Sequence, residues 1–442
     1  MFVFLTISLF LTSTIAQSEN LKNTKIDEED IILEIIQEID SDMMLSYIQD
    51  LVTIANKHDV KRLTGTEGCE EAREYILSEF MELGISTNIH DWAELGLIIP
   101  YKHLLFVSEN VEGVIPGKQG SYQSMVLMAH YDTTALTPSA DDNSAGVAAV
   151  LSAAKVLSQY EFNHEIRFLL VSGEEEGLLG SAAYAENAYS TCDNIKAVIN
   201  LDMIGYSDPE IEEDEYKVRC YETCSNVITN KVIDVCNNIE YSPYFNFEVI
   251  SSSDDAGHVS DQRSFCNYGY DAAFLHEFTW NENKDRGTDT IENMDYEYAT
   301  RVARLAAAVI ADYGLEQITE NRPPNPPAYV DGEKTIQIGE EQIFTTEGSD
   351  PDGDEIYFMF DWGDGTHSEW LGPYDAEDIC QASHIWNEPG EYKIKAKAKD
   401  SIGFQSAWSS KDKTKNLINN IFRNIIQKFP ILKLLLDKLI FL

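Results

Sequence analysis

The sequence predicts an α/β domain whose mainly parallel sheet is flanked by helices, followed by a smaller immunoglobulin-like β-sandwich. Apolar, strand-like runs alternate with helical stretches between residues 124 and 314, which is typical of a sheet covered on both faces. The composition then changes at NRPPNPP (321–327), a proline-rich spacer. Beyond the spacer, short runs such as QIFTT and IYFMFDW are separated by Gly, Asp and Pro turns, which indicates a sandwich.

The first domain is expected to begin with helical structure over 28–58, where Ile, Leu and Glu recur at helical spacing. A helix over 67–83 follows the turn signal RLTGTEG. Strands are then expected at 124–132, 165–172, 195–206 and 271–278, and helices at 144–160, 177–189, about 225–238 and 295–314. We place this domain at 28–318, the linker at 319–327 and the sandwich at 328–409.

The bulk composition narrows the functional classes. A net charge of −44 argues against a nucleic-acid-binding surface, which needs Lys and Arg for phosphate contacts. A hydrophobic content of 43% over 442 residues argues against a disordered chain. The seven cysteines leave at least one thiol unpaired within the chain. Cys220 and Cys224 are close enough in sequence to form a bridge, but the composition does not assign the pairing.

Both ends of the chain carry atypical segments. Residues 1–16 have the short apolar stretch and small final residues of a secretory signal peptide, although an uncleaved anchor is the alternative. Export, to the medium or the cell surface, is therefore expected. The tail, residues 411–442, is basic and amphipathic in an otherwise acidic protein. Such a segment suits a membrane surface or the acidic body of the protein itself.

Titratable side chains follow the expected strands at the ends where ligands gather in open α/β sheets. They are His130 and Asp132, Asp141 and Asp142, the three glutamates Glu174, Glu175 and Glu176, Asp202, His276 and Glu277, with Asp285 and Asp289 in a loop beyond. Several carboxylates at one sheet edge repel each other unless a positive charge offsets them. A donor set of nitrogen and oxygen without thiolates suits zinc or a harder divalent metal.

Three motifs in this region resemble a known family. AHYDTTALTPSADDNSAG, SGEEEGLLGS and NLDMIGY are similar to the central motifs of the M28 zinc peptidases, the co-catalytic aminopeptidase family. RLTGTEGCEEAREYILSEFMELG is similar to that family's N-terminal signature. The resemblance runs from about residue 30 to residue 315 and implies a two-zinc enzyme that acts on peptides.

The resemblance also implies individual roles. His130 would bind one metal ion, and Asp132 would orient the imidazole of His130. Asp142 would bridge the two metals, and its neighbour Asp141 would not bind metal. On the same grounds, Glu175 and Asp202 would each bind one of the two metals.

The resemblance makes Glu174 the general base, which moves a proton from water to the leaving amine. Glu176 would be the spare residue of the three, and we expect it to face solvent.

One position departs from the family. Relatives usually supply a histidine four residues before an Asp-Thr pair, and here that position is Asp285. Three interpretations stay open: Asp285 binds metal through oxygen, His276 or His258 replaces the usual histidine ligand, or the second metal is weakly held and activity is impaired. We hypothesise that the preceding residue, Lys284, supplies positive charge beside the oxyanion.

The second domain resembles a PKD domain over about 328–409, chiefly in DWGDGT and EPGEY. Its acids Asp350, Asp352, Asp354 and Asp361 have calcium-loop spacing, but Glu355 stands where that loop needs glycine, which favours a plain turn. The domain is expected to contact a surface, a polymer or a partner, or to act as a spacer.

Taken together, these motifs lead us to expect that the whole chain is an exported two-metal aminopeptidase. A catalytically weakened binding protein and a glutaminyl-cyclase-like zinc aminoacyltransferase stay open as alternatives.

Overall fold

The computed structural model describes residues 28–98, 102–118, 121–212, 215–222, 224, 226–252, 260–318, 321–333 and 338–409. The expected signal peptide and the basic tail lie outside these residues. Within them, no helix is both long and apolar enough to cross a membrane.

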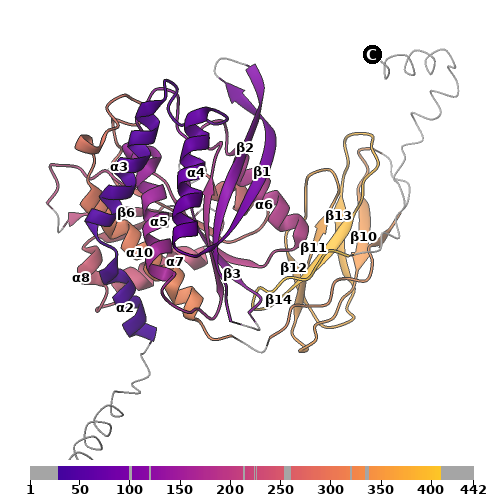
Figure 1. The fold of residues 1–442 in the computed structure, drawn as a ribbon. Helices are drawn as coiled ribbons and strands as arrows, with labels where there is room; N and C mark the ends of the chain where they lie inside the picture. Colours follow the sequence, from indigo (N-terminus) through magenta and orange to yellow (C-terminus); the bar gives the residue numbers. More distant parts are fainter. Residues whose placement is uncertain are drawn as a thin grey trace, which may run out of the picture.

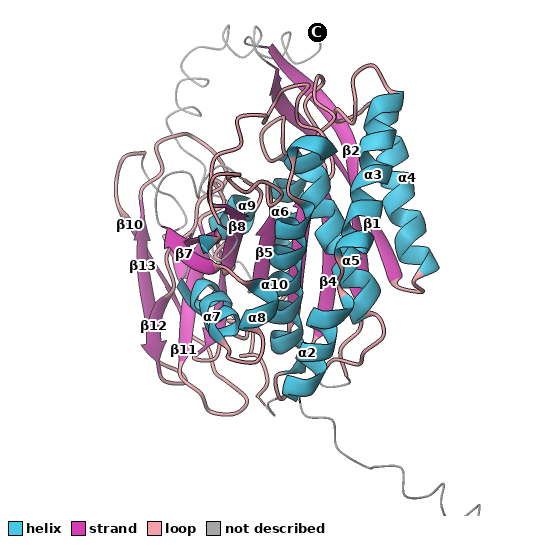
Figure 2. Cartoon of the chain, turned by 90° about the vertical axis from the view of Figure 1, so that its left-hand side faces the viewer, coloured by secondary structure: helices cyan, strands magenta, loops and turns pink. Residues whose placement is uncertain are grey.

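The first domain is built on an eight-stranded sheet (Figures 1 and 2). Its strands are β1 (Ser86–Ile98), β2 (Lys102–Ile115), β3 (Ser124–His130), β4 (Glu165–Val171), β5 (Ile195–Leu201), β6 (Lys217–Glu222), β7 (Glu248–Ser252) and β8 (Ala272–Glu277). Their order is β1-β2-β4-β3-β5-β8-β6-β7. The four expected strands, β3, β4, β5 and β8, run parallel to one another at its centre. The sheet as a whole is mixed, because β2 joins β4, and β6 joins β8, in antiparallel pairing.

Helices cover both faces of the sheet (Figure 2). They are α2 (Glu28–Glu38), α3 (Ser41–Lys57), α4 (Glu67–Glu82), α5 (Gly146–Leu157), α6 (Leu179–Thr191), α7 (Asn226–Asn237), α8 (Ser242–Phe245), α9 (Gln262–Asn267) and α10 (Tyr296–Leu315). Side chains of β3 alternate between two cores: Met125 and Leu127 pack with α5 and α10, whereas Val126 and Met128 pack with α6 and α9. Both faces are therefore buried, which explains why the central strands are uniformly apolar.

The second domain is a sandwich of two three-stranded sheets. Its strands are β9 (Asp331–Gly332), β10 (Gln342–Thr346), β11 (Ile356–Asp361), β12 (Leu371–Tyr374), β13 (Cys380–His384) and β14 (Lys395–Asp400). Trp362 and Trp386 lie in its core. The backbone N–H groups of Asp352, Gly353 and Asp354 all donate to one carboxylate oxygen of Asp350, so this acid closes a turn.

The sandwich packs against the side of the sheet that carries α6 and α9. The indole N–H of Trp408 donates to the Tyr189 carbonyl oxygen at 3.1 Å, and Met359 joins the apolar core beneath α6. The Lys397 ammonium lies 4.3 Å from the centre of the Tyr189 ring and is buried. The two domains thus share a packed junction centred on Tyr189.

Replacing Tyr189 with alanine is expected to destabilise the protein by about 3 kcal/mol, because the change removes a buried ring from this junction. Urea unfolding followed by tryptophan fluorescence measures the loss. Ile239→Ala is the matched control, since Ile239 is 87% exposed. Equal stability of the two variants would show that the junction contributes nothing.

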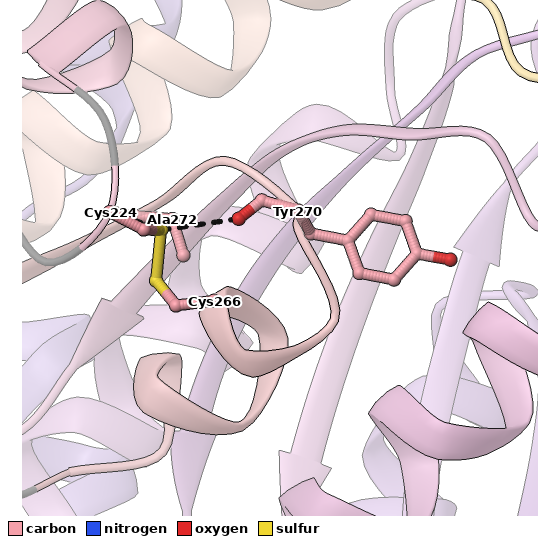
Figure 3. Close-up of a disulfide and its surroundings, with 4 residues drawn as sticks. All are labelled: Cys224, Cys266, Tyr270 and Ala272. Atoms are coloured by element: carbon pink, nitrogen blue, oxygen red, sulfur yellow. Dashed lines mark hydrogen bonds between the residues drawn. A yellow bond between two sulfur atoms is a disulfide. The ribbon is translucent and has the colours of Figure 1, made fainter. Parts of the chain in front are cut away.

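One disulfide joins Cys224, just after β6, to Cys266 in α9 (Figure 3). The bridge between Cys220 and Cys224 that their proximity allowed is not formed: Cys224 pairs with Cys266, and the buried Cys220 thiol donates to the Thr229 hydroxyl at 3.6 Å. Four residues of extended chain span roughly 13 Å, whereas bridged cysteines need their Cα atoms within about 7 Å.

Candidate metal centre

The carboxyl ends of β3 and β5 bring His130 and Asp202 together with Asp142. His130 ends β3, Asp202 directly follows β5, and Asp142 lies in the irregular turn Ala140–Ala145 that leads into α5. The His130 Nε2 atom is 3.3 Å from a carboxylate oxygen of Asp142 and 3.4 Å from one of Asp202. All three residues are buried, and their ligand atoms lie within 4.8 Å of one another. We call this set the first group.

A second set of ligand atoms shares Asp142. Asp142, Glu175 and Asp285 also offer carboxylate oxygens within 4.8 Å of one another, and we call this set the second group. Asp142 therefore stands between two adjacent positions, as a bridging carboxylate would. The five residues expected to bind metal are all brought to this one place.

Asp132 links the end of β3 to the turn that carries the glutamates. One of its oxygens is 3.5 Å from Nδ1 of His130. Its carboxylate also accepts the backbone N–H groups of Glu174 and Glu175, at 3.3 Å each, and the Thr64 hydroxyl at 3.0 Å. This arrangement can orient the imidazole and fix the glutamate turn at the same time.

The three glutamates point in different directions. Gly173, at φ +81°, starts a tight turn in which a side chain would be strained. Glu175 belongs to the second group, while Glu174 lines a cavity beside Asp202. The expectation that Glu176 faces solvent is wrong: the residue is only 7% exposed. The turn rolls Glu176 back toward Thr64 and Asp132, and burial together with the charge of Asp132 raises its pKa to about 8.

Two acids that were expected near the site but not among the metal ligands hold its loops in place. Asp289 accepts the backbone N–H groups of Asp141 and Asp142 at 2.9 and 3.2 Å. Asp141, the expected bystander, accepts the Gly205 N–H and the Asn281 amide, at 2.7 Å each. From the sequence, Asp289 was placed in the loop beyond the last expected strand, as the aspartate of the Asp-Thr pair, but no role was assigned to it.

A hydroxyl also positions Asp202. The Ser260 hydroxyl donates to Oδ2 of Asp202 at 2.6 Å, which leaves Oδ1 turned toward His130. No pattern in the sequence pointed to this serine, because it lies far along the chain from β5.

Asp285 occupies the position at which the resemblance predicts a histidine ligand, and it belongs to the second group. His276 belongs to neither group; its Nδ1 atom lies 2.6 Å from the carbonyl oxygen of Glu277. His258 lies outside the described residues. Lys284 contacts Asp142, with 2.5 Å between the ammonium nitrogen and Oδ2.

The electrostatics of the site favour a bound cation. Burial and the charge of Asp142 raise the pKa of Glu175 to about 9. Burial also raises the pKa of Asp261, a nearby acid, to about 7. Burial lowers the pKa of the His130 imidazole, but the negative charge of Asp202 outweighs burial, and the pKa lies well above its usual value. His130 Nε2, Glu175 Oε1 and Asp202 Oδ1, three buried atoms that could bind a metal, make no hydrogen bond within the described part of the chain. A divalent metal would satisfy these atoms and neutralise the acids, so the residues fit zinc.

A cavity of about 310 Å³ opens beside the two groups. Glu174, Asp202 and Lys284 line one part of it. Its other walls are largely aromatic, with Met203 and Arg219 beside the rings of Tyr221, Phe274, His276, Phe278 and Trp280. A small polar region next to an aromatic pocket is the usual composition of a site for a small ligand or one side chain.

Comparison with known proteins finds a family model that matches the part of the chain carrying this site. Residues 110–310 match "Peptidase family M28", and residues 328–411 match "PKD domain". A "Probable zinc metalloprotease" from Pyrenophora teres f. teres is 25% identical over 317 residues, covering 65% of this chain and 67% of that protein. "Aminopeptidase YwaD" from Bacillus subtilis is 28% identical over 216 residues, 46% of this chain and 44% of that protein. The sequence relatives are therefore zinc metalloproteases and aminopeptidases.

Solved structures share the fold. The LapA aminopeptidase of Legionella pneumophila matches with a TM-score of 0.55 and 21% identity, over 67% of this chain and 79% of that chain. The glutaminyl cyclase of Bacteroides thetaiotaomicron matches with a TM-score of 0.52 and 17% identity, over 62% and 98%. The predicted fold class is confirmed, and the fold by itself does not separate these two activities.

Proposed function

From the M28 peptidase match over residues 110–310 and the PKD match over 328–411, we propose that this chain is an exported, zinc-dependent aminopeptidase with two metal positions. The observation that carries the proposal is the pair of ligand groups that share Asp142. The first group would hold one ion and the second group the other.

Bound zinc would polarise the peptide carbonyl and acidify a water molecule. The protein's own residues supply the rest of the chemistry. Asp132 holds the imidazole of His130 and the backbone of the glutamate turn. Glu174 is anchored through its backbone but keeps its carboxylate in the cavity beside Asp202. It can therefore accept a proton from the attacking water and pass it to the leaving nitrogen.

The shape and charge of the cavity favour cleavage at a free N-terminus. Its largely aromatic walls suit one large apolar side chain, while a free substrate amine could contact a bound metal or a nearby acid such as Glu174. An acylated N-terminus would lose this contact.

The proposal is tested with nitroanilides of Leu, Phe, Ala and Asp, each with a free or an acetylated amine. We expect zinc-dependent hydrolysis of the free-amine substrates, fastest for Leu and Phe, and at least about a hundredfold slower hydrolysis of the acetylated ones. Equal rates on free and acetylated substrates would contradict an aminopeptidase.

The same panel separates the proposed aminopeptidase from two other functions, because neither of them would hydrolyse the nitroanilides. A glutaminyl-cyclase-like zinc aminoacyltransferase, which is compatible with the same fold, would cyclise N-terminal glutamine and leave the nitroanilides intact. The departure at Asp285 favours a weakened binding protein, which would bind peptides without turnover. The presence of Glu174 in the cavity lining argues against a binding protein that has lost catalysis.

The expected export is part of the proposal. The disulfide between Cys224 and Cys266 supports an oxidising compartment, since such bridges rarely persist in the cytosol. The PKD domain or the basic tail would then provide contact with a cell or membrane surface.

A further inference from the structure

The carboxylate that the two groups share faces a different cationic side chain through each oxygen: Oδ1 of Asp142 faces His130 and Oδ2 faces Lys284. The Lys284 ammonium lies 2.5 Å from Oδ2 of Asp142, the carboxylate that both groups share. Asp285, the next residue, is a member of the second group, and its φ of +58° turns the chain sharply after Lys284. The loop thus delivers an ammonium and a carboxylate to the same position.

The two groups differ in what neutralises them. In the first group the positive partner of Asp142 and Asp202 is His130, whose imidazole can give up its proton and bind metal through nitrogen. In the second group the positive partner is Lys284, and a charged ammonium has three donors and no lone pair. It can neutralise Asp142 but cannot bind a cation.

A dication can therefore use Oδ2 of Asp142 at the second position only when Lys284 moves away. Asp142 is 2% exposed and Lys284 28% exposed, so the pair is weakly screened by water. Two like charges in such a place repel strongly. Lys284 lines the cavity and 28% of its side chain is exposed, so its ammonium can leave Asp142 for solvent.

We infer that Lys284 is a built-in competitor for the second metal position, so that the first group takes up zinc first and the second group binds it more weakly. The inference rests on the proposed two-position site and specifies how that site fills. The second ion would be bound and lost in response to the surrounding zinc concentration, while the first stays in place.

The test is a zinc titration of the full-length, metal-free protein by calorimetry, with inductively coupled plasma analysis of the bound metal. Wild type is compared with Lys284→Met, which keeps the side-chain length without the charge, and with Lys284→Arg, which keeps the charge. Lys57→Met, a lysine with 54% of its side chain exposed, is the control for loss of one positive charge. Circular dichroism confirms that each variant is folded.

We expect two binding steps in wild type, or one step and a second too weak to measure. Lys284→Met should tighten the second step by about tenfold or more and leave the first within about threefold, while Lys284→Arg and Lys57→Met behave as wild type. Equal affinity of both positions in wild type, or an unchanged second step in Lys284→Met, overturns the inference and leaves the proposed function intact. Failure of wild type to bind any zinc overturns both.

Discussion

Replacing Glu174 with glutamine is expected to lower kcat by about a thousandfold, because the amide cannot accept the proton that the attacking water must lose. That loss corresponds to about 4 kcal/mol of transition-state stabilisation. KM should change little, since the variant keeps the size and polarity of the side chain. The measurement is steady-state hydrolysis of a leucyl nitroanilide.

The structure explains why this effect should belong to Glu174 and not to its neighbours. Glu175 is in the second ligand group, so Glu175→Gln should reduce bound metal, whereas Glu174→Gln should not. Glu176 is buried toward Thr64, away from the cavity. Glu161→Gln, at an exposed position, is the control for a neutralised acid. A Glu174→Gln variant that keeps more than a tenth of the wild-type kcat would remove Glu174 from the chemistry.

Removing the metal is expected to abolish hydrolysis and to destabilise the fold. After treatment with a chelator and dialysis, activity should fall by more than about a hundredfold and return when zinc is added. The melting temperature should fall by several degrees, because the clustered carboxylates lose their neutralising charge and zinc no longer favours the folded state.

The destabilisation should be larger at pH 8 than at pH 5. Burial raises the pKa of Asp261 to about 7 in the folded, metal-free protein, above its unfolded value of about 4. An acid of this kind binds more protons folded than unfolded, so its contribution to stability is lost as pH rises from about 4 to about 7. Nearby dications would lower that pKa and relieve the penalty. A zinc-induced rise in melting temperature that is larger at pH 5 would contradict this account.

The central strands and the residues at their ends followed from the sequence. Strand β3 is buried on both faces, so its continuous apolar run could be recognised in the sequence. Because the strand ends at His130, this residue was expected at the edge of the sheet where ligands bind. Asp202 followed in the same way from β5. Parallel strands fix where their ends meet, and this is why residues far apart in the chain could be brought together by inference.

Other features depend on geometry that a linear pattern does not carry. The direction of Glu176 is set by the turn after Gly173, and three adjacent glutamates give no sign of which one turns inward. The hairpin of β1 and β2 was not predicted, since β1 mixes His, Asp and Glu with apolar residues and has no continuous apolar run.

Contacts between distant loops were equally hidden. Asp289 accepts the backbone N–H groups of Asp141 and Asp142. Every residue except proline has such a group, so the sequence of the turn does not reveal this contact. The ion pair of Lys284 with Asp142 joins residues that only the fold brings into contact.

The central claim is that divalent metal neutralises the acids gathered around Asp142. Anomalous diffraction at the zinc absorption edge, from crystals grown with zinc, tests this claim most directly. We expect a strong peak among His130, Asp142 and Asp202, and a weaker one among Asp142, Glu175 and Asp285. A map without a peak at either position would contradict the account.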